Sequence, residues 1–225
     1  MKKPVVNYRE FRLSRIKEPR FSHLLWLLPW VGYFIAYFLT ENLIPREACH
    51  IIHSPLDDMI PFCEWFVIPY TFWYLLIVIS LLYFALYNPE NFKKLMQFIA
   101  VTQLVAMIIY VIYPNRQDLR PTEFENDNVL TWIVGFLYSF DTSTNVCPSL
   151  HVAYSIGIAS VWLKEKLASR GVKVFMVIAA VIISISTAFV KKHSVVDIFA
   201  AIPLGILAEA VVFWKYYKKK FKKTA

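Results

Sequence analysis

The sequence is poor in the residues that build the commonest phosphate and metal sites. It has 5 glycines in 225 residues, no glycine-rich phosphate loop and no carboxylate cluster that would hold magnesium. Cys49, Cys63 and Cys147 lack metal-ligand spacing, so we expect free thiols, although Cys49 and Cys63 could bridge in an oxidising compartment. Internal repeats and low-complexity segments are also absent. These absences exclude a P-loop and a cysteine-ligated metal site.

Acidic residues are scarce too, with 16 Asp and Glu against 24 Lys and Arg and a formal net charge of +8. Basic proteins often bind nucleic acid, but here the basic residues gather beside apolar runs and no pattern of stacking aromatics accompanies them. Hydrophobic residues make up 58% of the chain, and the mean hydropathy is +0.49. The composition predicts an all-α polytopic membrane protein, built as one bundle, with membrane lipids rather than nucleic acid as partners.

Six apolar runs have the length and composition of membrane-crossing helices. They cover residues 21–39, 65–87, 95–113, 149–163, 174–190 and 195–214. A seventh run, 129–140, is too short to cross and predicts an extra interfacial or re-entrant helix. The first run begins too late for a cleavable signal peptide, so we expect an anchor. The predicted architecture is a six-helix membrane domain, 21–214, between basic tails at 1–20 and 215–225.

The distribution of charge orients this domain. If the amino terminus is cytoplasmic, the two tails and the loops around Lys93 and Lys164 hold nearly all lysines and arginines. The exceptions are Arg46, Arg116, Arg120, Lys191 and Lys192. This asymmetry follows the positive-inside rule, so we expect a plasma-membrane protein with both termini in the cytoplasm. Three polar segments then share one layer on the outer side; they are 116–121, 147–151 and 191–197.

The segment 191–197 carries the strongest chemical pattern, because charged groups between two apolar runs are costly unless they serve a function. In a helix, His193 and Asp197 share one face. The carboxylate can then fix the tautomer of the imidazole and leave its other nitrogen as a nucleophile. The lysines beside this pair favour an anion such as phosphate.

A phosphate site can be assembled from the three segments. Arg120 offers a bidentate fork, Lys191 a point charge, and Ser149 a hydroxyl beside the free N–H groups of a helix start. His193 is the predicted nucleophile, which forms a phosphohistidine, and His151 the acid that protonates the leaving alkoxide and then activates the acceptor. We expect a reaction without metal or other cofactor.

Each residue alone has a simpler interpretation. His151 alone indicates a packed helix-end histidine, and the arginine and lysines alone indicate surface groups or headgroup anchors. The segment 40–64 holds His50 and His53 beside acidic residues, but no ligand spacing recurs, which favours a solvated or interfacial loop over a metal site. The joint placement of the three segments on one membrane face favours catalysis.

At these residues the chain resembles a known family. Pro148-Ser149-Leu150-His151 is similar to the Pro-Ser-x-His block of the type 2 phosphatidic acid phosphatase superfamily, the acid-phosphatase-like and haloperoxidase-like membrane enzymes. His193-x-x-x-Asp197, preceded by Ser186, resembles its last motif, and Arg120-Pro121 the end of its first. The resemblance covers the second half of the chain. It implies a histidine nucleophile, a second histidine as acid, and metal-free hydrolysis or exchange of lipid phosphoesters.

Two positions depart from the family pattern. Tyr113 stands where the first motif usually has a lysine, and Thr187 where the last usually has an arginine. The resemblance implies that Arg116 and Lys191 supply these two positive charges instead. This variant of the motifs is similar to the branch that contains inositol phosphorylceramide synthase and sphingomyelin synthase. Members of that branch move phospho-headgroups between lipids.

Three functions follow as expectations. The first is a lipid-phosphate phosphatase at the outer leaflet, with water as acceptor. The second is a phosphotransferase with a lipid hydroxyl as acceptor, and the sequence leaves the choice of acceptor open. The third is of another class: a lipid transporter or scaffold in which Arg120 and Lys191 only bind headgroups.

Overall fold

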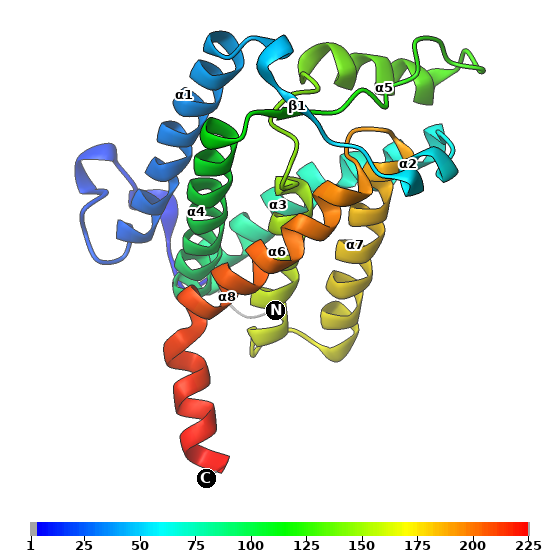
Figure 1. Cartoon of the computed structure of the whole chain (residues 1–225). Coiled ribbons are helices and arrows are strands. Elements are labelled where there is room, and N and C mark those ends of the chain that lie inside the picture. Colours follow the sequence, from blue (N-terminus) through cyan, green and yellow to red (C-terminus); the bar gives the residue numbers. More distant parts are fainter. Residues whose placement is uncertain (1–3, 225) are drawn as a thin grey trace.

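A computed structural model describes residues 4–224 of the chain and the side chains of residues 4–219. In this range the fold is helical, and its longer helices run beside one another while the short segments between residues 44 and 149 gather at one end (Figure 1). The longer helices are α1 (Leu28–Leu43), α3 (Val67–Tyr87), α4 (Pro89–Ile112), α6 (Leu150–Lys164), α7 (Arg170–Phe189) and α8 (Val195–Thr224).

Five helical segments of the described chain are long and apolar enough to cross a membrane. They are Ser22–Leu43, Glu64–Tyr87, Pro89–Ile112, Arg170–Phe189 and Val195–Lys219. The first includes a 3₁₀ turn over Ser22–Leu27 that leads into α1. The prediction of an all-helical protein with membrane-crossing helices is confirmed at this level, and the bounds of these segments contain or closely match five of the six predicted runs. The remaining run, 149–163, forms α6, which is not among the five.

Helix α6 lies at the centre of the bundle and has 15 residues, fewer than the other long helices. It packs against α3, α4, α7 and α8. Its buried residues include four in succession, Val152 to Tyr154 and Ser155, so no side of its first turns faces outward. A helix buried on all sides needs apolar or small residues all round. At Gly157 the ring of Phe98 from α4 comes so close that a Cβ would lie 2.5 Å from it.

The short segments form a layer over one end of the bundle. Strand β1 (His50–Ile51) pairs in parallel with β2 (Asn115–Arg116), with His50 opposite Asn115. Helices α2 (Pro55–Met59) and α5 (Val129–Phe140) lie at the same end, where α6 and α8 begin (Figure 1). Residues far apart in the sequence are thereby brought to the starts of α6 and α8.

Lys93, predicted in a loop between two spans, lies in α4. This helix begins at Pro89, because the Asn88 side chain caps it by accepting a 3.1 Å hydrogen bond from the Asn91 N–H. Residues 40–64, predicted to form a solvated or interfacial loop, are mostly exposed, but they contain β1 and α2, and Asp57 is only 2% exposed. The helix expected over residues 129–140 is present as α5.

The described parts of both basic tails belong to the folded structure. In the described part of the amino-terminal tail, Val6 is buried and the Val5 N–H donates to the Leu86 carbonyl at 2.8 Å, so this tail folds onto the end of α3. Helix α8 continues beyond residue 214 into the carboxy-terminal basic tail, and this end projects from the bundle (Figure 1).

The contact at Gly157 gives a test of the packing. We expect Gly157→Ala to destabilise the protein by about 1–3 kcal/mol, because the added methyl group overpacks the α4–α6 contact. Gly32→Ala on α1 is the matched control, since no atom lies within 4 Å of its Cβ position. Thermal unfolding in one detergent measures both. Equal melting temperatures for the two variants would contradict the close approach of α4 and α6.

Candidate active site

The turn between α7 and α8 holds the predicted nucleophile and its partner. The N–H groups of Lys192 and His193 both donate to the Thr187 carbonyl, at 3.0 and 3.1 Å, which closes α7. His193 Nδ1 lies 3.1 Å from Asp197 Oδ2, which also accepts a 3.0 Å bond from the Ser194 N–H. Asp197 is in the first turn of α8, where the helix dipole favours a carboxylate. With Nδ1 bonded to Asp197, Nε2 of His193 is the free ring nitrogen.

His151 lies beside this pair, in the first turn of α6. Its ring centroid is 5.7 Å from that of His193, with the rings at 61°. From α3, the ring of Tyr70 stacks on it at 4.8 Å, and the ring of Trp73 lies at 4.3 Å with the planes tilted by 40°. Its Nε2 is buried and has no hydrogen-bond partner among the described residues. A buried polar atom without a partner costs about 1–3 kcal/mol, so this nitrogen is available to a ligand.

Backbone contacts fix the two histidine segments to each other. The Ser149 N–H donates to the Asp197 carbonyl at 3.1 Å, which joins the start of α6 to the start of α8. The Ser149 side chain is fully buried and caps α6 by accepting from the Val152 N–H at 3.4 Å. The Tyr110 hydroxyl donates to the Pro148 carbonyl at 2.8 Å. The structure therefore uses the predicted phosphate ligand Ser149 as a helix cap.

Two cations meet around Tyr138. The guanidinium of Arg120 lies 4.7 Å above its ring and donates to the carbonyls of Tyr138 and Thr142 at 3.1 and 2.5 Å. The ammonium of Lys192 lies 5.9 Å from the same ring and 2.6 Å from Asp141 Oδ2. Arg120 Nε is buried and finds no partner in the part of the chain that the structure describes. Arg120, Lys192 and Asp141 thus form one charged cluster.

The other predicted phosphate ligands are engaged elsewhere. Lys191 Nζ donates to the carbonyls of Asp57 and Ile60, at 2.8 and 2.5 Å, which anchors the turn on α2. Arg116 pairs with Asp118 at 3.3 Å. The structure therefore places Lys192, rather than Lys191, in the cluster with Arg120.

The electrostatics of Asp141 connect the cluster to the imidazoles. Burial would raise the pKa of Asp141, but the charge and hydrogen bond of Lys192 oppose it. His151 and Arg120 act in the same direction, so the pKa of Asp141 lies below its ordinary value. Burial lowers the pKa of Lys192 and of Arg120, and the Asp141 carboxylate opposes both shifts. The two cations and His151 are therefore close enough to Asp141 to influence its charge.

Asp57 is a site-supporting residue that the sequence reading missed. Its Oδ1 accepts from the Val195 N–H at 2.8 Å, and its Oδ2 accepts from the Ser194 hydroxyl at 2.6 Å and the Ser54 N–H at 2.8 Å. It therefore caps both α2 and α8. The available signal was the Ser-x-x-Asp spacing from Ser54, which is typical of a capping box.

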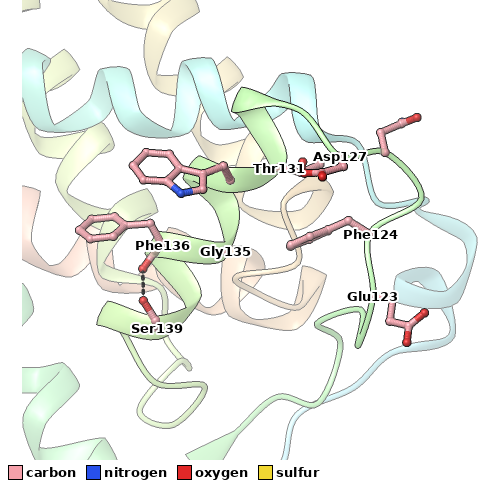
Figure 2. A pocket seen from close by; sticks show the side chains of 9 residues that line it. Glu123, Phe124, Asp127, Thr131, Gly135, Phe136 and Ser139 are labelled. Atoms are coloured by element: carbon pink, nitrogen blue, oxygen red, sulfur yellow. Dashed lines mark hydrogen bonds between the residues drawn. The ribbon is translucent and has the colours of Figure 1, made fainter.

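The larger of the two described surface hollows lies away from these residues. It has a volume of about 730 Å³ and runs along α5, where Figure 2 shows Glu123 and Asp127 near one end and Phe136 near the other. Its described lining contains acidic and aromatic residues but no lysine or arginine. Two carboxylates without a cation would repel phosphate, so this hollow does not fit the predicted chemistry.

The remaining histidines and the cysteines form no metal centre in the described residues. No three side chains of His, Cys, Asp or Glu come together there in a way that could hold a metal ion. The ring of His50 stacks on Tyr113 at 4.2 Å, and His53 pairs with Asp58 at 2.9 Å. Each cysteine is free within residues 4–224.

Comparison of the chain with protein-family models, curated proteins and solved structures finds no match in any of the three. The assignment of a function therefore depends on the motifs and on the geometry described above.

The role of Asp57 can be tested by stability. We expect Asp57→Asn to destabilise the protein by about 1–3 kcal/mol, because the amide turns one buried acceptor into a donor that faces donors. Asp58→Asn is the control, since that carboxylate is exposed and contacts His53. Thermal unfolding of both variants gives the comparison. If the Asp57→Asn and Asp58→Asn variants have the same melting temperature, Asp57 does not hold the start of α8.

Proposed function

We propose that this protein is an integral-membrane phosphatase of lipid phosphates that acts as members of the type 2 phosphatidic acid phosphatase superfamily do. One observation carries the proposal: the rings of His151, from α6, and His193, from the turn between α7 and α8, lie 5.7 Å apart. The Asp197 partner of His193 and the nearby cluster of Arg120 and Lys192 support it. A nucleophile, an acid and an anion site are the parts that phosphoryl transfer requires.

In the first step, Nε2 of His193 attacks the phosphorus of the lipid phosphate. The bond from phosphorus to the lipid oxygen breaks, and protonated His151 gives its proton to the leaving alkoxide. The products are a lipid alcohol and a phosphohistidine at His193. Asp197 holds the ring through Nδ1 and stabilises the positive charge that develops on it. Arg120 and Lys192 stabilise the charge on the equatorial phosphate oxygens.

In the second step, neutral His151 takes a proton from water, and the oxygen attacks phosphorus. The P–N bond breaks, inorganic phosphate leaves, and both histidines return to their starting states. A lipid hydroxyl in place of water would form a new phosphoester, which is the phosphotransferase alternative. The contacts of His151 favour neither acceptor, because its Nε2 makes no hydrogen bond to the described residues.

We propose with this function that the protein crosses the plasma membrane six times, through the five candidate spans and α6. Both described ends of the chain lie toward the same end of the bundle, opposite the short segments, and we assign that end to the cytoplasm (Figure 1). The histidines then lie at the outer leaflet. Helix α5 is the interfacial helix, since Trp132, Phe136 and Phe140 on it are 70%, 57% and 80% exposed.

A function of another class would use the same cations. In a lipid transporter or scaffold, Arg120 and Lys192 would bind headgroups without bond cleavage. Vanadate, which mimics the phosphoryl transition state, separates the two classes. The enzyme should bind vanadate through both histidines and lose activity, whereas a carrier need not respond.

The proposed chemistry predicts the effects of histidine substitutions. We expect His193→Ala to abolish phosphate release from phosphatidate and His151→Ala to lower kcat by roughly 10²–10⁴. Purified protein with phosphatidate, phosphatidylglycerophosphate or polyprenyl diphosphate, in the presence of a chelator, provides the assay. His53→Ala is the control, because His53 contacts only exposed Asp58 among the side chains described. Full turnover by His193→Ala would reject the nucleophile, and loss of all activity with chelator would reject a metal-free reaction.

The two adjacent lysines provide a matched pair. We expect Lys192→Met to lower kcat/KM by about 10²–10³, because it removes a cation from the cluster with Arg120. We expect Lys191→Met to lower the melting temperature, because its ammonium joins the turn to the carbonyls of α2. Kinetics and thermal unfolding of both variants test the assignment. A loss of kcat/KM in Lys191→Met at unchanged stability would return the phosphate contact to Lys191.

A further inference from the structure

A second surface hollow lies between α4 and α8, near the end of the bundle opposite the histidines. Its volume is about 450 Å³. Lys94 and Lys215 line it together with Trp26 and Trp214. Lys94 is in the second turn of α4, roughly 8 Å from the helix start at 1.5 Å per residue. With the membrane boundary placed at the start of α4, the hollow is at the depth where a headgroup meets the acyl chains.

The walls of this hollow change from polar to apolar along α4. Gln97 follows Lys94 by one turn, and Leu104 lies two further turns along the helix. From α8, Val211 lines the same hollow. Leu104 is 63% exposed and Val211 57% exposed, so the apolar part is open to the surrounding lipid. An acyl chain can lie along this part while its headgroup reaches the lysines.

The lysines of the hollow carry charge that no described carboxylate balances. Lys94 Nζ donates only to neutral oxygens, the Val212 carbonyl at 3.1 Å and Gln97 Oε1 at 3.4 Å. Neither Lys94 nor Lys215 forms a salt bridge within residues 4–219. By contrast, Lys164 at the same end of the bundle pairs with Glu209 at 2.6 Å. The hollow thus presents unpaired positive charge at headgroup depth.

We propose that this hollow binds an anionic phospholipid of the leaflet opposite the histidines. The phosphate contacts the ammonium groups of Lys94 and Lys215, one acyl chain follows Leu104 and Val211, and the indole of Trp214 lies at the headgroup boundary, where tryptophan is favoured. Charge complementarity selects an anionic over a zwitterionic headgroup. The inference does not depend on the proposed enzymatic function, because no residue of the histidine site lines the hollow.

The experiment measures lipid selectivity with the full chain in phosphatidylcholine vesicles. The quenching of tryptophan fluorescence is measured with two brominated lipids. One is phosphatidylglycerol and the other is phosphatidylcholine, each with bromine on its acyl chains. We expect stronger quenching by the brominated phosphatidylglycerol, and we expect this excess to disappear in a Trp26→Phe/Trp214→Phe variant. Equal quenching by the two brominated lipids would overturn the proposal.

The contribution of each lysine is tested in the same vesicles. We expect Lys94→Gln and Lys215→Gln each to lower the relative binding constant of phosphatidylglycerol by about fivefold. Lys215→Gln is the safer variant for folding, because Lys215 is exposed and makes no described hydrogen bond. Lys218→Gln is the control, an equal loss of charge on α8 at an exposed residue outside the hollow. Equal losses in Lys215→Gln and Lys218→Gln would show general surface attraction and reject the site.

Discussion

The need to give partners to the buried charged and polar groups of the turn after α7 organises the end of this protein that holds the histidines. Lys191, Lys192, His193, Ser194 and Asp197 are all less than 10% exposed. Groups of this kind are costly to bury unless each has a partner. The partners come from segments far apart in the sequence: carbonyls and a carboxylate of α2, the carboxylate after α5, and the backbone at the start of α6. The turn can fold only when these segments have assembled around it.

Helix α6 positions the second histidine, His151, relative to this turn. Its middle is fixed by the close packing of Gly157 against Phe98 of α4, and its start by the hydrogen bond from the Ser149 N–H to the Asp197 carbonyl. His151 is then held between the aromatic rings of α3 and the ring of His193. The distance between the histidines is therefore set by the packing of α6 and by the hydrogen-bonded turn that holds His193, which is the preorganisation that the proposed catalysis requires.

The sequence predicted the parts of this site that follow from helical periodicity and topology. The contact of His193 with Asp197 was predicted for two residues on one helix face; the contact is present, but His193 lies in the turn before α8 and only Asp197 is in the helix. The approach of His151 was predicted from the topology, and its ring lies 5.7 Å from that of His193. The choice between the lysines did not follow, because Lys191 has a φ of +50°, and this left-handed residue sends the side chains of Lys191 and Lys192 to different partners. The role of Asp57 also did not follow, since its partner Ser194 is 137 residues away.

Asp141 shows how the proposed phosphate site can be stable without a ligand. Lys192 is only 3% exposed, and an unpaired ammonium at such a place would be costly, so the carboxylate allows the lysine to be buried. The same carboxylate weakens the attraction of Lys192 for a phosphate, because the two anions compete for one cation. Arg120 does not share this limit, since its described hydrogen bonds go to carbonyls and its Nε is free. In the proposed reaction, Arg120 therefore supplies most of the attraction for the substrate, and Lys192 contributes when negative charge builds up on the transferring phosphoryl group.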